Sequence, residues 1–168
     1  MGFTDSSWAD DCDNRHSSMG YCFTLGSGII SWSAQKQKTV TCSSTEAEYI
    51  AASESCREAV WLRMMLSQLN QPCPSAIPLF TSGFANSQLL TATSLYCDNN
   101  GAICLAHDPQ FHSQAKHINY QHHQIHDCIE SKDISLLHVD THNNLADIFT
   151  KPLGCLAFTQ FHGLLGLG

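Results

Sequence analysis

The chain has 168 residues, 43% of them hydrophobic, which suits one domain with a buried core. It carries 15 acidic and 8 basic residues, a net charge of −7, with no Lys or Arg between Met64 and Ala115; this argues against strong autonomous binding to nucleic acid. No hydrophobic run approaches the roughly 20 residues of a membrane span, and a secretory signal is absent, so we expect no membrane partner. We predict a single domain over residues 1–168.

The nine cysteines predict no disulfide framework and no zinc ribbon, because none forms a CxxC pair. Most lie among apolar neighbours, as in YCF, LYCD and AICLA, where a thiol packs like a small core residue. Reduced cysteines are typical of an intracellular compartment, and we expect the cytoplasm or the nucleus.

The first part of the chain predicts an antiparallel meander. We expect a short strand over residues 1–6 and a polar loop over 9–18. Two further strands, 19–25 and 29–34, flank a Gly-Ser-Gly turn of the kind that suits a tight hairpin.

A long helix follows the meander. The sequence SSTE at residues 43–46 places hydroxyl groups and an acid where a helix begins. Apolar residues then recur at helical spacing as far as about Asn70, and Pro72 and Pro74 end the helix. A long surface loop, rich in Pro, Ser, Thr and Gly, is predicted over residues 71–93.

The second half alternates strands with helices. We predict strands over 94–97 and 134–139, and helices over 101–107, 115–132, 143–150 and 156–165. Together with the meander, this order is typical of an α/β protein with a mixed sheet.

Three aspartates lie at or near the ends of predicted strands and helices, where the fold would bring them together. Asp5 lies on the first strand, Asp98 ends a later strand, and Asp147 lies in a helix after another strand. Clustered carboxylates repel one another unless a cation neutralises them, and Mg²⁺ prefers such oxygen ligands. Each aspartate taken singly is more often a turn or helix-cap residue, so the pattern alone leaves that interpretation open.

Five stretches of the sequence resemble a known family. FTDSSWADD, SSTEAEYIAASES, LYCDNNGAICLA, KHIN and LADIFTKPL, in this order, resemble the ribonuclease H domain of copia-type retrotransposon polyproteins, from about residue 2 to 165. The resemblance implies a ribonuclease H-like fold, a five-stranded mixed sheet flanked by helices. It also implies a two-metal endonuclease that uses Mg²⁺, or Mn²⁺ as a substitute, to hydrolyse the RNA strand of RNA–DNA hybrids.

The same resemblance implies a parent polyprotein. We expect the chain to be either a domain excised from such a polyprotein or a standalone derivative of a mobile element. In the first case a reverse transcriptase domain is a second expected partner, beside the RNA–DNA hybrid.

The resemblance implies four catalytic, metal-binding carboxylates: Asp5, Glu48, Asp98 and Asp147. The glutamate is a choice, because TEAEY contains two. Glu46 and Glu48 lie about 200° apart around a helix axis, so they cannot both face the metals. We prefer Glu48, which lies in the AEYIAA stretch, and interpret Glu46 as a first-turn acid favoured by the helix dipole.

Histidines add further candidates. The resemblance implies a histidine in the loop before the last aspartate, which moves protons or releases product. His138 and His142 are available, and we prefer His142 as a catalytic residue because His138 belongs to a strand. His122 and His126 have the i, i+4 spacing of a zinc site, although a solvated helix face is the favoured interpretation. His117, within KHIN, is expected near the substrate or the sheet edge.

Two alternative functions are retained. Family members carry more basic residues in the stretch that here reads HSQAKHINYQHHQIHD, where only Lys116 is basic. A catalytically weak or silent module that acts in protein interaction is therefore the main alternative. A junction resolvase or integrase core would share the metal chemistry, but it is disfavoured by the SSTEAEY and FTKPL motifs.

Overall fold

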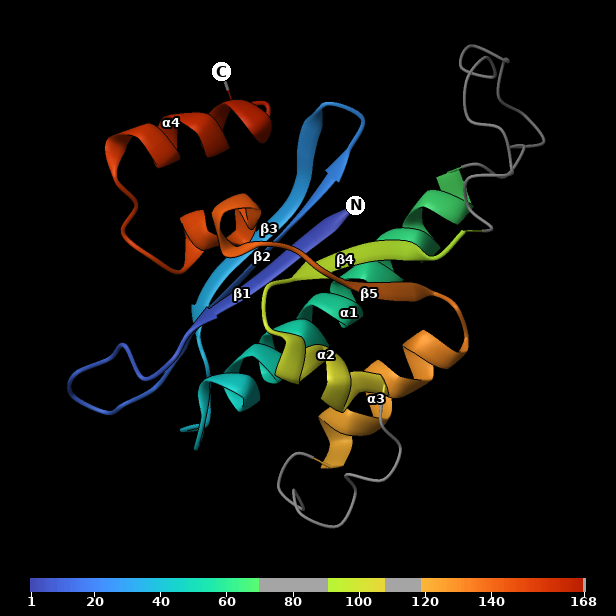
Figure 1. The fold of residues 1–168 in the computed structure, drawn as a ribbon. Helices are drawn as coiled ribbons and strands as arrows, with labels where there is room; N and C mark the ends of the chain where they lie inside the picture. Colours follow the sequence, from blue (N-terminus) through green and yellow to red (C-terminus); the bar gives the residue numbers. More distant parts are fainter. Residues whose placement is uncertain (70–90, 108–118, 168) are drawn as a thin grey trace.

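A computed structural model describes residues 1–69, 91–107 and 119–167 (Figure 1). Five strands form one sheet in the order β3-β2-β1-β4-β5. β1 pairs antiparallel with β2 and parallel with β4, so the predicted five-stranded mixed sheet is confirmed. The strands are β1 (Gly2–Ser7), β2 (Ser18–Leu25), β3 (Gly28–Lys36), β4 (Thr93–Cys97) and β5 (Ile134–His138).

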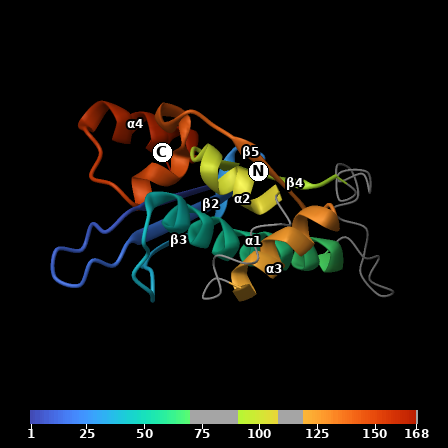
Figure 2. The ribbon, with the colours of Figure 1, turned by 60° about the horizontal axis from the view of Figure 1, so that its bottom comes forward.

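Helices cover both faces of this sheet. Figure 2 shows α1 and α3 on one side of the sheet and α4 on the other. The helices are α1 (Ser44–Leu69), α2 (Asn100–His107), α3 (Asn119–Glu130), α4 (Cys155–Leu164) and two 3-10 helices, η2 (Thr141–Asn143) and η3 (Leu145–Phe149). None of the helices in the described ranges is both long enough and apolar enough to cross a membrane.

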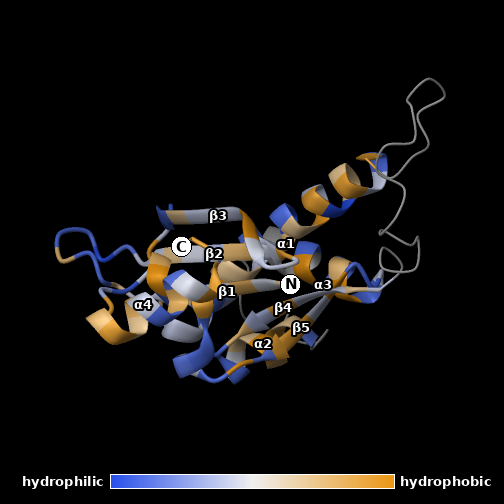
Figure 3. Cartoon of the chain, turned by 90° about the horizontal axis from the view of Figure 1, so that it is seen from above, coloured by the Kyte–Doolittle hydropathy of each residue, from blue (hydrophilic) through white to orange (hydrophobic). Residues whose placement is uncertain are grey.

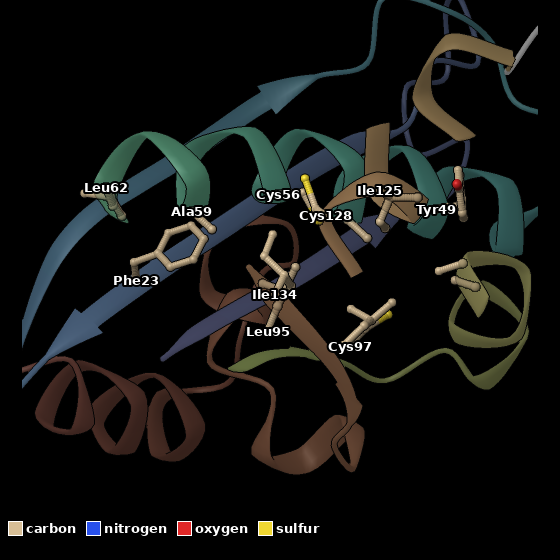
Figure 4. Close-up of a cluster of buried hydrophobic side chains, with 14 residues drawn as sticks. Phe23, Tyr49, Cys56, Ala59, Leu62, Leu95, Cys97, Ile125, Cys128 and Ile134 are labelled. Atoms are coloured by element: carbon tan, nitrogen blue, oxygen red, sulfur yellow. The ribbon is translucent and has the colours of Figure 1, made fainter. Parts of the chain in front are cut away.

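The larger hydrophobic core lies between the sheet and the helices α1 and α3. Figure 4 shows Phe23 of β2, Leu95 of β4 and Ile134 of β5 facing side chains of α1 and α3. A smaller cluster, which includes Phe3, lies against η3 and α4 on the other face. Alternate side chains of a strand point to opposite faces of the sheet. Because each face has its own cluster, the central strands are buried on both sides. This fixes β1 and β4 in the middle of the molecule.

The start of α1 determines which glutamate faces the sheet. The Glu46 backbone N–H donates to Ser43 Oγ (3.2 Å), and Glu46 Oε2 accepts from the Cys42 backbone N–H (2.7 Å). This arrangement resembles a capping box, in which the third helical residue reaches back over the helix start. The Glu46 side chain is thereby directed toward the N-terminal end of α1, as expected of a first-turn acid.

The element predicted as a helix over residues 143–150 is the shorter 3-10 helix η3. Its N-cap is Asn144, whose side chain accepts from the Ala146 backbone N–H. Pro152 disfavours helical geometry at Lys151 and cannot donate a backbone hydrogen bond, so a longer helix is stopped here. Short 3-10 turns are common where an α-helix cannot extend.

The helix predicted over 115–132 ends earlier, at Glu130 of α3. Lys132 has a positive φ of 60°, and the Asp133 backbone N–H donates to the Cys128 carbonyl (3.0 Å). This is the geometry of a Schellman motif, which ends a helix by satisfying its last carbonyls. Residues 115–118, and residues 70–90 within the predicted 71–93 loop, lie outside the described residues.

Candidate metal centre

Four carboxylates meet at one end of the sheet. β1 and β4 are parallel neighbours in the sheet (Figure 1). Asp5, on β1, and Asp98, which follows β4, therefore reach the same end of the sheet. Ligand oxygens of Asp5, Asp98 and Asp147 all lie within 4.8 Å of one another. A second group meets the same limit and consists of Glu48, Cys97 and Asp98. Asp98 therefore belongs to two adjoining groups, and the four expected carboxylates form one acidic cluster.

Most of this acidic cluster is buried. Asp5 has no exposed surface, and Glu48 and Asp147 are each 6% exposed. Asp98 is partly exposed and opens the cluster to solvent. Burial of a carboxylate is costly unless a partner compensates its charge. Each buried carboxylate therefore needs a neighbouring donor or cation.

Lys151 compensates two of the charges. Its Nζ lies 3.0 Å from Asp5 Oδ1 and 3.0 Å from Asp147 Oδ1. Thr150 Oγ1 donates a hydrogen bond to the other oxygen of Asp5. Burial lowers the pKa of Lys151, but the two carboxylates outweigh it and raise the pKa above the ordinary value. The ammonium group is thus a cation that the chain itself places between Asp5 and Asp147.

Lys151 is not among the residues predicted from the sequence. Its i, i+4 spacing from Asp147 was visible in ADIFTK and is a common arrangement of ion pairs on helices. The contact with Asp5, however, joins residues 146 apart in the chain, and local spacing carries no information about it.

Glu48 is the least compensated carboxylate. Its Oε1 accepts a hydrogen bond from the Ser6 backbone N–H (3.1 Å). Burial, together with the charges of Asp5 and Asp98, raises the pKa of Glu48 to about 9. Without a cation the group retains its proton at neutral pH, and a positive charge bound beside it would favour ionisation.

The neighbouring carboxyl of Asp147 shows the same effect more weakly. Burial and the charge of Asp5 raise the pKa of Asp147 to about 6, while Lys151 acts in the opposite direction. Like charges at short range disfavour ionisation, and one ammonium group offsets only part of that cost. The single ammonium group therefore neutralises only part of the negative charge that the acidic cluster would carry with all its carboxyl groups ionised.

The chemistry of the donors fits a hard divalent cation. Cys97 Sγ lies 4.0 Å from Glu48 Oε2, but burial and the Glu48 charge raise the pKa of the Cys97 thiol to about 12. A protonated thiol is a poor ligand, which leaves the four carboxylates as donors. Carboxylate oxygens suit Mg²⁺ or Mn²⁺ rather than soft metals.

The histidines lie outside these groups. His142, in η2, is exposed, and so is His138 at the end of β5, which does not have the buried position of a structural strand residue. His126 lies 3.8 Å from Glu130 in an i, i+4 pair. Within the described ranges, neither acidic group includes a histidine. His117 and the His122 side chain lie outside the described part of the chain.

The cysteines are reduced throughout the described ranges, where all eight are free. Cys22, Cys56, Cys97 and Cys128 are buried as small core residues, and four others are exposed. Cys73 lies outside the described residues.

The sequence is similar to polyproteins of plant transposons. The chain is 38% identical over 165 residues to the retrovirus-related Pol polyprotein from transposon RE2 of Arabidopsis thaliana, covering 98% of the chain and 10% of that protein. It is 36% identical over 166 residues to the corresponding polyprotein from transposon TNT 1-94 of Nicotiana tabacum, covering 99% of the chain and 11% of that protein. The resemblance to copia-type polyproteins is confirmed. The chain spans about a tenth of the length of these relatives. No protein-family model matches it.

Solved structures show the fold. The chain matches the RNase H1 of Halobacterium salinarum with a TM-score of 0.53 at 14% identity, covering 88% of this chain and 91% of that one. It matches LC11-RNase H1, solved in complex with an RNA/DNA hybrid, with a TM-score of 0.52 at 12% identity and the same coverage. The ribonuclease H-like fold is therefore confirmed.

Proposed function

We propose that this chain is a metal-dependent endonuclease that hydrolyses the RNA strand of RNA–DNA hybrids. The observation that carries the proposal is the pair of acidic groups that share Asp98. Asp5, Asp98 and Asp147 in one group, and Glu48 with Asp98 in the other, would supply the carboxylate oxygens for divalent cations. Two divalent ions so placed supply a nucleophilic water and stabilise the leaving oxygen of a phosphodiester.

The residues of the chain have distinct proposed roles. Asp5, Glu48, Asp98 and Asp147 would hold Mg²⁺, with Mn²⁺ as a substitute. The pKa of Glu48 is about 9, so this residue would act as an ionised ligand only with positive charge bound beside it. His142, exposed on η2 five residues before Asp147, is proposed to take up or deliver a proton near the site.

Lys151 would balance charge in the absence of metal. Its Nζ contacts Asp5 and Asp147, so it would offset part of the cost of burying these two carboxylates. When a divalent ion binds the same oxygens, the ammonium group is free to contact a phosphate of the substrate.

One of the solved structures supports the proposed substrate class. LC11-RNase H1 was solved with an RNA/DNA hybrid, and the similarity in fold supports the same class of substrate here. Recognition would read the shape of the hybrid and its 2′-hydroxyl groups rather than its base sequence. In a parent polyprotein, a reverse transcriptase domain would be the neighbouring partner. The cytoplasm or nucleus stays our prediction for the compartment.

A cleavage assay tests this function. The chain is incubated with a hybrid labelled on its RNA strand, at low salt, with Mg²⁺, Mn²⁺ or EDTA. We expect cleavage with either metal, none with EDTA, and loss of at least about 100-fold for Asp98→Asn, which removes a charge common to both groups. A wild-type protein that leaves the hybrid intact with both metals would exclude the proposal.

A non-catalytic interaction module is the second candidate, and the ion pairs favour it. Four of the eight basic residues contact acidic side chains instead of lying free for phosphates: Lys36, Arg57, Arg63 and Lys151. If this candidate is correct, hybrid and duplex DNA bind equally and divalent metals do not change the affinity.

A further inference from the structure

Asn144 connects the two elements that carry Asp5 and Asp147. Its side chain is fully buried. Nδ2 donates to the Thr4 carbonyl (3.0 Å), and Oδ1 accepts from the Ala146 backbone N–H (3.2 Å). Thr4 immediately precedes Asp5, and Ala146 immediately precedes Asp147. One side-chain amide therefore holds the backbone beside both aspartates.

On β1, this hydrogen bond lies just beyond the ladder with β4. The last pair between the two strands joins Phe3 to Tyr96. The Asn144 amide reaches the next residue, Thr4, through a contact between positions 140 residues apart. It therefore ties η3 to the central strand at the point where the neighbouring strand no longer pairs with it.

On η3, the same side chain is the helix cap. This 3-10 helix is only five residues long, Leu145–Phe149. Short 3-10 helices have poor hydrogen-bond geometry and little stability of their own. The position of Asp147 relative to β1 thus depends on what anchors η3, and Asn144 is an anchor that satisfies both of its own polar groups.

We propose that Asn144 is a positioning residue that sets the separation of Asp5 and Asp147 and thereby the affinity of the site for divalent cations. It acts through the backbone and touches neither the ion nor the substrate. The inference rests on the proposed function only in taking these aspartates as metal ligands.

The test separates the two hydrogen bonds of Asn144. In Asn144→Ser the hydroxyl can still cap η3, as serine does at many helix starts, but it is too short to reach the Thr4 carbonyl. In Asn144→Ala both bonds are lost. Calorimetric titration of the whole chain with Mg²⁺ and with Mn²⁺ should show binding at least about tenfold weaker for both variants.

Ser55→Ala is the matched control. Ser55 Oγ donates to Thr4 Oγ1 (2.9 Å), so this variant also removes a buried hydrogen bond to Thr4, but one that leads to α1 rather than to η3. We expect its thermal midpoint in EDTA to fall while its metal affinity stays within about twofold of wild type, because a merely structural role changes stability alone.

The outcomes are distinguishable. Wild-type protein that binds neither metal would refute the proposed function. Wild-type protein that binds, beside Asn144→Ser that binds equally well, would refute the role of Asn144 and leave the proposed function intact. Equal weakening by Ser55→Ala, or failure of Asn144→Ser to fold at 10 °C, would also overturn the inference, since the amide would then serve the fold in general.

Discussion

Charge balance within the acidic cluster determines how its individual residues behave. Asp5 and Asp147 share the ammonium group of Lys151, whereas Glu48 has a backbone N–H and no cation in contact. The pKa of Glu48 is accordingly raised to about 9, against about 6 for Asp147. Stability and metal binding should therefore respond differently to substitutions at Glu48 and at Lys151.

Replacement of Glu48 by Gln should stabilise the metal-free protein at high pH. The folded-state pKa of about 9 lies above the ordinary 4.5, so the contribution of Glu48 to stability is complete below pH 4.5 and is lost as pH rises through 9. Glutamine has no proton to lose. In EDTA, the free energy of unfolding of Glu48→Gln should exceed that of wild type by at least about 1 kcal/mol at pH 8 to 9.

Denaturant unfolding in EDTA at pH 4 and pH 8.5 measures this effect. The difference between variant and wild type should be small at pH 4. With saturating Mg²⁺ it should shrink or reverse, because an ion binds only the ionised glutamate. A constant difference at both pH values would show that Glu48 does not titrate in the fold.

Replacement of Lys151 by Met should destabilise the metal-free protein. The change leaves Asp5 and Asp147 buried without their cation, which we expect to cost roughly 1–3 kcal/mol, less than for a fully buried pair. Lys36→Met is the control, because Lys36 pairs with Asp11 while itself 61% exposed, and ion pairs in contact with solvent contribute little to stability. Thermal unfolding in EDTA compares the two, and equal losses would contradict the role of Lys151 in the site.

At the level of elements, the close packing of η3 on the sheet brings Asp147 to Asp5. Gly20 of β2 lies opposite Asp5 in the register of β1 and β2. A Cβ at Gly20 would lie 2.7 Å from the Cβ of Phe149 and 3.0 Å from Cγ2 of Thr150. η3 approaches the sheet at a place where no larger residue fits, and the phenyl ring of Phe149 then stacks on Trp32 (5.7 Å, 11°).

Gly20→Ala should therefore loosen both the fold and the metal site. The methyl group must displace the end of η3, at a cost of roughly 1–3 kcal/mol, and the displacement carries Thr150 and Lys151 away from Asp5. Gly28→Ala is the control, because a Cβ at Gly28 meets nothing within 4 Å. Denaturant unfolding and Mg²⁺ titration should show both losses for Gly20→Ala and neither for Gly28→Ala.

Over the whole molecule, negative charge dominates. The net charge is −7. Part of it comes from Asp10, Asp11 and Asp13, in the hydrophilic loop between β1 and β2 that is coloured blue in Figure 3. Within residues 1–69, 91–107 and 119–167, four basic residues already contact acids: Lys36, Arg57, Arg63 and Lys151. Attraction to a nucleic-acid backbone is correspondingly weak.

Hybrid binding should depend only weakly on salt. With at most five phosphate contacts, one of them from Lys151 once a divalent ion has released it, the slope of log K against log salt concentration should be no steeper than about −4.5. Fluorescence anisotropy of a labelled hybrid with Asp98→Asn protein, at 25 to 200 mM KCl in Mg²⁺, measures the slope. A markedly steeper slope would reveal a basic surface that these ion pairs do not predict.

Much of the fold follows from local pattern. The Gly-Ser-Gly turn between two short runs predicted the meander, and the SSTE cap predicted the start of α1 within one residue, because turns and helix caps depend on near neighbours. Errors arose where local pattern was weakest: η3 replaced the helix predicted over 143–150, since Asn144 and Pro152 confine it to a short turn.

The sequence by itself determined the elements, the order of Asp5, Asp98 and Asp147 along them, and the likeness to copia-type polyproteins. Only the tertiary structure decided that Asp98 belongs to two acidic groups and that Lys151 lies between Asp5 and Asp147. The physical reason is distance along the chain. Contacts between residues about 140 apart are created by strand order and by the packing of η3 on β1, which no local periodicity encodes.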